Sequence, residues 1–258
     1  VFSTVSFAGV DVTEYIRVKL SDGTIEEVEL DTYLYSVVQS EMGVSYKASG
    51  MSKSEAVPID ALKAQAVASR SYAVYNINKA GEDAEFHVTA STSSQVYNHN
   101  ANINANVKKA VDETSGQVLS YNGELVLYPQ FFSTSSGQTE NSEDVYLGEI
   151  PYLRSVSSTG EESAPKYTST KSLKISDFVY LLNSNFSNLN LTVENIKNNF
   201  KIKSSSEAGG VIKLDINNVE IRGIDFRKAL SLNSTNFTYE FNGDTITFNC
   251  KGYGHGVG

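Results

Sequence analysis

The sequence predicts an α+β fold in which helices pack on a mostly antiparallel sheet, with a smaller α+β subdomain inserted. Three hairpin patterns, two adjoining helical segments and a later block of mixed helix and strand pattern support this class. The chain has 258 residues, enough for a core and a subdomain. We expect the core to comprise residues 1–158 and 236–258, and the inserted subdomain to comprise residues 165–235.

The first predicted elements are a hairpin and a helix. Residues 1–30 contain two alternating runs, YIRVKL and TIEEVEL, on either side of a Ser-Asp-Gly turn. A helix should follow over residues 33–42, capped by Asp31 or Thr32 and ended by a glycine. Glu41 then lies in its last turn, where the negative end of the helix dipole disfavours an ionised carboxyl group. Such a position suits a general acid.

The second helix is predicted from Pro58 to the residue before Gly81, and nearly every face of it is small or apolar. Lys63 and Arg70, seven residues apart, are therefore expected to point into packed protein or into a cleft. Buried cations need a counter-ion, and Glu41 is the candidate. The spacing leaves two interpretations open, a functional site or a structural network of ion pairs.

The rest of the chain continues with helix and hairpin patterns. NANVKKAVDETSG predicts a helix closed by a glycine, and a hairpin turning at Asn-Gly follows it, with Pro129 at an edge or a bend. Residues 157–170 have the composition of a linker. Residues 171–235 mix helix and strand patterns, and a third hairpin then leads to the tail GYGHGVG.

Composition excludes several functions. A net charge of −9 argues against nucleic acid or an anionic membrane as the main partner. The chain has no apolar run of 18 residues, so we expect it to be soluble as given, although it starts at Val1 rather than Met and an anchor could lie outside it. A single cysteine, Cys250, rules out an intrachain disulfide. Many Tyr, Asn, Ser and Thr residues suit a polar, uncharged ligand such as a sugar.

Three short motifs are candidate sites. GYGHGVG is not a dinucleotide fingerprint; it is either a terminal turn or a loop that brings His255 to a ligand. His87 and His99 have no Cys or acidic partner at metal-ligand spacing, so they do not predict a zinc site. The STSSG stretch at residues 133–137 is typical of a loop that binds a polar ligand, and the absence of a G-x-S-x-G elbow argues against a serine nucleophile.

In combination, these segments resemble the stage II sporulation protein D (SpoIID) family over nearly the whole chain. The resemblance is carried by LYSVVQSEM, ALKAQAVASRSYAV, SQVY, FFSTSSGQTENSEDV, PYLRSV and GYGHGVG, in that order. It implies a lytic transglycosylase that acts on peptidoglycan glycan strands. The catalytic acid of the family maps to Glu41, the required lysine and arginine map to Lys63 and Arg70, and the tyrosine of P-Y-L maps to Tyr152.

The chain also departs from the family. Many clostridial members carry a Cys-Asp-x-x-His-Cys pattern before Q-V-Y that is thought to hold zinc. The corresponding residues here are Thr89, Ala90, Ser93 and Ser94, and hydroxyls are poor zinc ligands, so we expect no metal and no cofactor. The loop FFSTSSGQT also lacks the histidine and the paired glycines common in the family.

A hydrolytic glycosidase generally uses two carboxyl groups, whereas the sequence offers one placed glutamate, which is enough for a lytic transglycosylase. Protonated Glu41 would donate to the oxygen between N-acetylmuramic acid and N-acetylglucosamine, and would then take the proton of the muramic 6-hydroxyl to give a 1,6-anhydro end. We expect Arg70 to support the site and Lys63 to contact the substrate or the carboxylate. The residues expected to line the sugar cleft are Gln95, Tyr97, Ser136, Tyr152 and His255.

The resemblance also implies partners and a location. These are peptidoglycan strands, an amidase within an engulfment complex, and the cell wall or the space between the two membranes of a sporulating cell. The alternative is a non-catalytic glycan-binding module that enhances a partner amidase. The changed loops favour the alternative, and the retained Glu41, Lys63 and Arg70 disfavour it. A purely structural surface protein would leave the buried cations without a purpose.

Overall fold

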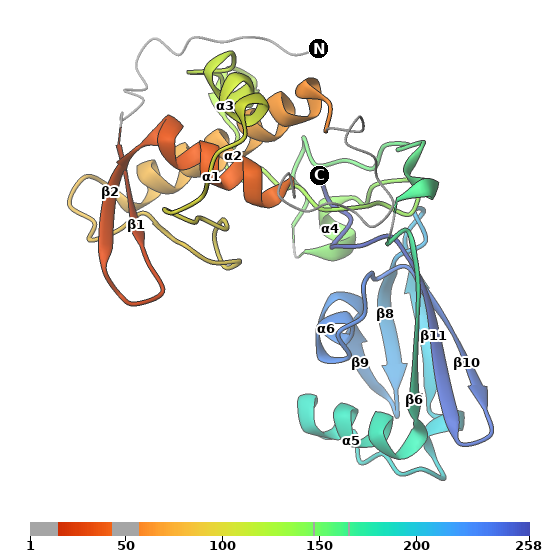
Figure 1. Cartoon of the computed structure of the whole chain (residues 1–258). Helices are drawn as coiled ribbons and strands as arrows, with labels where there is room; N and C mark the ends of the chain where they lie inside the picture. Colours follow the sequence, from red (N-terminus) through yellow and green to blue (C-terminus); the bar gives the residue numbers. More distant parts are fainter. Residues whose placement is uncertain (1–14, 43–56, 147, 165) are drawn as a thin grey trace. The chain divides into compact units, whose positions relative to one another are not determined.

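The computed structural model describes residues 15–42, 57–146, 148–164 and 166–258, and it confirms the α+β class. The chain divides into two compact units, the first ending at Pro129 and the second beginning at Gln130 (Figure 1). Within the described ranges, no helix combines the length and the apolar content that a bilayer crossing requires.

The first unit begins with the predicted hairpin. β1 (Tyr15–Lys19) and β2 (Ile25–Glu29) are antiparallel, and β3 (Val88–Thr89) pairs with β1 in parallel. Ile16 and Val18 of β1 are fully buried in the same core as the helices. One face of this small sheet therefore packs on the helices.

α1 (Leu30–Glu41) is the first predicted helix. It begins three residues before the expected Tyr33, because β2 leads into it without a loop and Glu29 is the N-cap residue. The predicted end at Gly43 and the loop over residues 43–56 lie outside the described residues.

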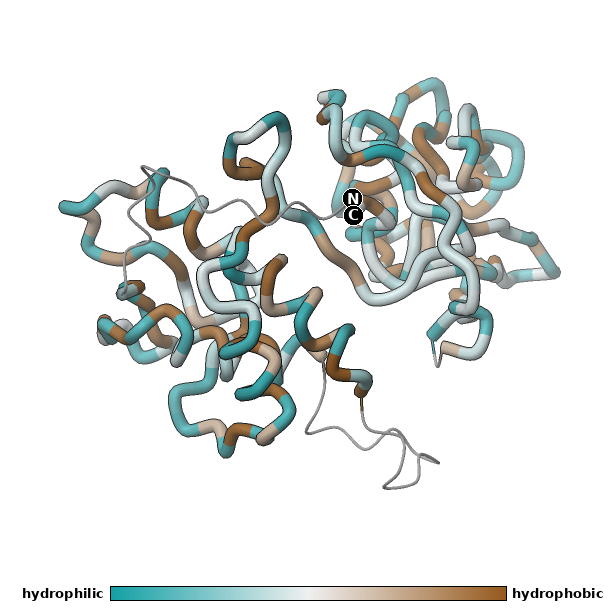
Figure 2. The backbone as a smooth tube through the Cα atoms, turned by 90° about the horizontal axis from the view of Figure 1, so that it is seen from above, coloured by the Kyte–Doolittle hydropathy of each residue, from teal (hydrophilic) through white to brown (hydrophobic). Residues whose placement is uncertain are grey.

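α2 (Ile59–Ala80) begins after Pro58 and ends before Gly81, as the sequence predicts. Gly81 has a φ of +83°, a conformation that favours glycine. Along the described chain as a whole, short hydrophobic and hydrophilic stretches alternate, as expected of helices and strands that bury one face (Figure 2). The apolar residues that α2 buries in the core are Leu62, Ala66, Ala73, Val74 and Ile77.

α3 (Ala105–Asp112) is the third helix of this unit. Asn104 caps its start, because the Asn104 side chain accepts a hydrogen bond from the backbone N–H of Asn106 at 2.8 Å. Glu113 follows the helix as its C-cap residue, and Gly116, with a φ of +72°, lies in the turn beyond it.

β4 (Ser120–Tyr121) and β5 (Glu124–Leu125) form the second predicted hairpin. Its two turn residues, Asn122 and Gly123, have φ values of +53° and +84°. Two successive positive φ values match the right-handed twist of the strands, which is why Asn-Gly is a strong hairpin signal.

The second unit contains two three-stranded antiparallel sheets. Its elements are α4 (Ser142–Val145), β6 (Thr168–Lys174), α5 (Ile175–Asn185), β7 (Phe200–Ser205), β8 (Val211–Ile216), β9 (Val219–Arg222), α6 (Gly223–Ala229), β10 (Phe237–Asn242), β11 (Thr245–Lys251) and two 3₁₀ helices (Glu161–Ser163 and Ile196–Asn198). In one sheet β11 lies between β10 and β6, and in the other β8 lies between β7 and β9. The third predicted hairpin is the pair of β10 and β11.

An aromatic core holds the second unit together. Phe248 of β11 contacts Phe178 of α5 and Phe226 of α6, with ring centroids 5.6 and 5.8 Å apart. All three rings are fully buried. Because β11 also pairs with β6, the buried residues of β10 and β11 belong to the same core as α5 and α6. The sequence pattern instead predicts that residues 236–258 share a core with residues 1–158.

Candidate functional site

Glu41 is the last residue of α1, which confirms its predicted place in the final turn. Its side chain is half-buried. The Oε1 atom accepts a hydrogen bond from the backbone N–H of Val96, with a nitrogen–oxygen distance of 3.4 Å. The main chain around Val96 therefore fixes one oxygen of the carboxyl group.

The residues on either side of Val96 face the interior. The side-chain oxygen of Gln95 accepts a hydrogen bond from the Tyr33 hydroxyl at 3.2 Å, and the Gln95 amide nitrogen donates to the carbonyl of Ser69 at 3.4 Å. The ring of Tyr97 packs on that of Tyr33 with centroids 5.2 Å apart. Gln95 is 1% exposed and Tyr97 is 8% exposed. These two expected sugar contacts thus hold the main chain that reaches Glu41.

The two tyrosines are hydrogen-bond donors over the physiological pH range. Burial raises the pKa of Tyr33 well above its usual value. Burial, and then the charge of Glu26, raises the pKa of Tyr97 to about 12. The Tyr97 hydroxyl donates to Glu26 Oε1 at 3.3 Å.

The ion pairs of the described residues give both cations a partner other than Glu41. Arg70 Nη2 lies 3.0 Å from Asp31, and Lys63 Nζ lies 2.7 Å from Glu113. Asp31 is ten residues before Glu41 in α1, about 15 Å along the helix axis. Because α1 and α3 pack antiparallel, Glu113 lies near the start of α1 as well. The expectation that Glu41 is the counter-ion of these cations is therefore wrong.

Arg70 joins three helices. Its side chain is 1% exposed, and Nη1 donates to the carbonyl of Thr114 at 2.7 Å, while Nη2 reaches Asp31. The hydroxyl of Ser115 donates to the other oxygen of Asp31 at 2.7 Å. Burial lowers the pKa of Arg70, and Asp31 opposes this shift. The guanidinium thus links the start of α1, the middle of α2 and the turn after α3.

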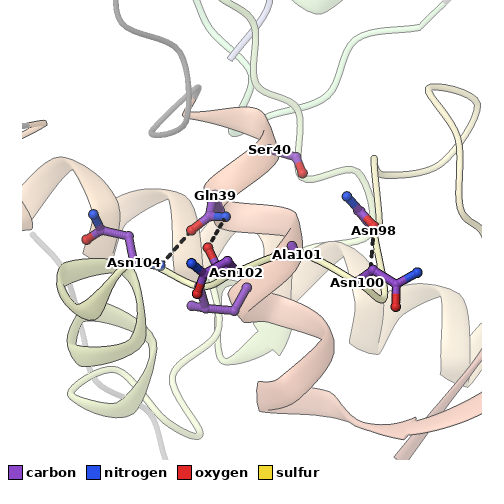
Figure 3. A pocket seen from close by; sticks show the side chains of 8 residues that line it. Gln39, Ser40, Asn98, Asn100, Ala101, Asn102 and Asn104 are labelled. Atoms are coloured by element: carbon purple, nitrogen blue, oxygen red, sulfur yellow. Dashed lines mark hydrogen bonds between the residues drawn. The ribbon is translucent and has the colours of Figure 1, made fainter.

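A pocket of about 560 Å³ lies beside the last turn of α1 (Figure 3). Five of its eight lining residues carry side-chain amides, and Ser40 immediately precedes Glu41. Sequence analysis missed this pocket, although the alternation of Asn in NHNANINAN was a visible signal. The lining residues are Gln39, Ser40, Asn98, Asn100, Ala101, Asn102, Ile103 and Asn104.

The other three expected sugar contacts, Ser136, Tyr152 and His255, belong to the second unit. The Ser136 hydroxyl donates to the carbonyl of Ala208 at 3.2 Å. Tyr152 is half-buried and packs with Val145, Leu153, Ile224 and Val257. Backbone hydrogen bonds between Thr134 and Tyr253 join the STSSG loop to the C-terminal tail.

The tail GYGHGVG packs against its own unit. A Cβ atom at Gly254 would lie 2.8 Å from Phe132, and one at Gly256 would lie 2.8 Å from Glu140, so both positions require glycine. The His255 ring lies against Phe132 and Tyr146, at centroid distances of 5.6 and 5.9 Å. The alternate glycines therefore allow close packing around the imidazole.

The main chain contacts the His255 ring at two residues, Val257 and Phe131. The N–H of Val257 donates to Nδ1 at 3.2 Å, and the ring also bonds to the backbone of Phe131. Burial, and then the charge of Arg227, lowers the pKa of His255 to about 4. The imidazole is thus neutral near pH 7 and holds the tail in place.

This pKa predicts that the second unit loses stability in acid. The unfolded chain binds a proton at the ordinary pKa of 6.5 and the folded chain only near 4, so stability falls as pH falls between these values. The expected loss is about 3 kcal/mol. His255→Phe keeps an aromatic ring between Phe132 and Tyr146 but should lack this pH dependence. Urea denaturation of both proteins at several pH values tests this prediction. If the free energy of unfolding changes with pH by the same amount in both proteins, the assignment to His255 is contradicted.

Hydroxyl groups cluster at the positions that the resemblance aligns with the Cys-Asp-x-x-His-Cys pattern. Thr89 Oγ1 lies 3.0 Å from Ser93 Oγ and 3.2 Å from Ser94 Oγ. Ser91 Oγ lies 2.7 Å from Ser93 Oγ. This donor set does not fit zinc, which prefers thiolate and imidazole, and the described part of the chain contains no group of three His, Cys, Asp or Glu at metal-binding distances.

Comparisons with known proteins match this chain to sporulation proteins. A family model described as stage II sporulation protein matches residues 20–121, which contain α1, α2 and α3. The amidase enhancer of Bacillus subtilis (strain 168) is 37% identical over 120 residues, which cover 46% of this chain and 14% of that protein.

Two relatives are similar over most of both chains. Stage II sporulation protein D of Bacillus subtilis (strain 168) is 33% identical over 254 residues, which cover 93% of this chain and 68% of that protein. Stage II sporulation protein D of Bacillus amyloliquefaciens is 32% identical over the same length and with the same coverage. The chain therefore belongs to the stage II sporulation protein D family.

Proposed function

We propose that this chain is a lytic transglycosylase that cleaves peptidoglycan glycan strands, with Glu41 as its single acid–base group. Family membership supports a role in sporulation. The observation that carries the proposal is the position of Glu41, half-buried at the end of α1 beside an amide-lined pocket. The Val96 N–H binds Oε1, so Oε2 is the oxygen that would carry the catalytic proton.

The reaction needs one proton carrier. Oε2–H of Glu41 donates its proton to the oxygen that joins N-acetylmuramic acid to N-acetylglucosamine, and the bond from muramic C1 to that oxygen breaks. The muramic 6-hydroxyl then attacks C1 and gives its proton to the Glu41 carboxylate. The acid is regenerated, a 1,6-anhydro end forms, and no water is consumed. The N–H of Val96 stabilises the carboxylate while it exists.

Arg70 and Lys63 would act without direct contact to Glu41, because their ion-pair partners are Asp31 and Glu113. We assign Arg70 as a positioning residue, because it fixes α1 against α2 and α3 from the interior. Lys63 is half-exposed, so we assign it to contact with the substrate strand, with Glu113 as its partner in the free protein.

Lys63→Met should therefore leave the fold intact and weaken activity. The side chains of Lys63 and Glu113 are 33% and 42% exposed, so water screens the pair and its loss should not lower the melting temperature measurably. Activity on purified strands should fall severalfold, through a higher KM at an unchanged kcat. A lowered melting temperature with an unchanged KM would instead make Lys63 a structural residue.

The second candidate function is a glycan-binding module that stimulates a partner amidase. The similarity to the amidase enhancer favours it. In both functions the protein would act outside the cytoplasm, in the cell wall or between the two membranes of a sporulating cell, with an amidase as partner.

Digestion of purified glycan strands separates the two functions. The strands are prepared with and without stem peptides, incubated with the chain, and analysed by mass spectrometry and by co-sedimentation. Anhydro-muramic ends released by the chain alone support the transglycosylase. Intact strands that retain the protein, together with faster cleavage by an added amidase, would support the binding module and overturn the enzymatic proposal.

A further inference from the structure

The pocket beside the end of α1 is lined without charge. Its amide side chains come from Gln39 and from alternate residues of the segment 98–104, and none of the described residues that line it is ionisable. Side-chain amides both donate and accept hydrogen bonds without carrying a charge. Ionised side chains such as Lys, Arg, Asp and Glu carry a charge, which favours ligands of the opposite charge. The lining thus matches a neutral ligand that is rich in hydroxyl and amide groups.

Two side chains of α1 hold the pocket segment in shape. Ser36 Oγ donates to the Asn98 carbonyl at 3.0 Å and accepts from its N–H at 2.8 Å. One turn later, Gln39 donates to the Asn102 carbonyl at 2.9 Å and accepts from the Asn104 N–H at 2.7 Å (Figure 3). Both α1 residues are buried, so the segment is fixed before any ligand arrives.

Two of the four asparagine side chains that line the pocket already make hydrogen bonds within the protein. Asn98 Oδ1 accepts from the N–H of Asn100 at 3.1 Å, and Asn104 Oδ1 caps α3. The side chains of Asn100 and Asn102 are exposed and make no hydrogen bond to other described residues. Among the described lining residues, these two amides are the ones with both donor and acceptor free for a ligand. Ala101 and Ile103 lie half-buried between them and offer apolar contact.

We propose that this pocket binds an N-acetylated sugar ring of the strand that Glu41 cleaves. An acetamido group presents one C=O and one N–H on opposite sides of its trans amide, so a different Asn side chain can bond to each, and its methyl group suits the contact with Ala101 and Ile103. Ser40 lines the pocket and the next residue is Glu41, so the bound ring would neighbour the scissile bond. The volume of about 560 Å³ lies within the usual range of small-ligand sites. The identity of the strand rests on the proposed function, whereas the preference for an acetamido sugar does not.

The test measures binding in the Glu41→Gln background, which prevents turnover. The probes are a tetramer of N-acetylglucosamine, the glucose tetramer that lacks acetamido groups, and a glycan fragment of peptidoglycan stripped of peptides. Titrations are followed by calorimetry and by the side-chain amide signals in NMR spectra. We expect both acetylated probes to bind and the glucose tetramer to bind at least tenfold more weakly.

The paired variant is Asn100→Ala with Asn102→Ala, and its matched control is Asn106→Ala, an exposed amide on α3 outside the pocket. The paired variant should bind the acetylated probes about tenfold more weakly and keep its melting temperature, because the Gln39 contacts are to the backbone. The control should bind as before.

Equal affinity of the paired variant and the control would overturn the pocket assignment. Equal affinity for the glucose tetramer would overturn the acetamido preference. Failure of the enzymatic proposal has a different readout, which is the absence of anhydro ends from strands treated with the unaltered chain. Binding at the pocket by a chain that releases no such ends would keep this inference and remove only the catalytic proposal.

Discussion

Glu41→Gln is expected to abolish the release of anhydro-muropeptides from purified glycan strands. Glutamine has nearly the same shape as glutamic acid, and its oxygen still accepts the hydrogen bond from the Val96 N–H. It cannot give a proton to the leaving sugar or take one from the 6-hydroxyl. Proton transfer by a placed side chain contributes about a hundredfold or more to a rate, and here one group performs both transfers.

The matched control for this variant is Glu82→Gln, which changes an exposed carboxyl group of the same unit. Its activity should equal that of the unaltered chain. The melting temperatures of both variants should stay within error of the original, since neither side chain is part of the buried core. A Glu41→Gln protein that keeps more than a tenth of the original rate would remove Glu41 from the role of acid.

Arg70→Met is expected to cause the largest loss of stability of the substitutions considered. Methionine fills much of the same space but donates no hydrogen bond. The carbonyl of Thr114 would lose its hydrogen-bond donor, and Asp31 would lose its counter-charge. Both groups would then face the apolar side chain of the introduced methionine. Removing one partner of a fully buried ion pair costs about 3–5 kcal/mol, and the loss here should be at the lower end because Asp31 is 32% exposed. We expect α1, α2 and the turn after α3 to lose protection together.

Hydrogen exchange measured by mass spectrometry reports this loss separately for each unit. Peptides from α1, α2 and α3 should exchange faster in Arg70→Met, and peptides from β6 and β11 of the second unit should not. Lys63→Met is the matched control on the same helix, because its ion pair is exposed. Equal exchange in Arg70→Met and in the control would show that the guanidinium does not hold the three helices.

Local patterns in the sequence were sufficient for most elements of the fold. Pro58 and Gly81 bound α2, and Asn122-Gly123 forms the hairpin turn, because each of these residues has a conformational preference that acts over a few residues. The position of Glu41 in the last turn of α1 follows from the same kind of signal. The predicted start of α1 was less accurate. β2 leads directly into α1, so the helix begins before Asp31 and Thr32, the two residues expected to cap it.

Contacts between distant segments were not predictable in this way. The helical wheel of α2 identified Lys63 and Arg70 as unusual, but their partners depend on how α3 packs against α1. Likewise, the assignment of residues 236–258 required knowledge that β11 pairs with β6. Gln95 and Tyr97 were expected at a sugar cleft, and only the fold shows that their side chains turn inward while Val96 reaches Glu41.

The most direct test of the central claim is a digestion in water enriched in heavy oxygen. A lytic transglycosylase with one acid–base group closes the 6-hydroxyl onto C1, so the new muramic ends should lack the mass of one water molecule and carry no label. The mass spectrum of the released fragments decides the matter. Labelled reducing ends would contradict the account, because they require an attacking water and a second carboxyl group to activate it.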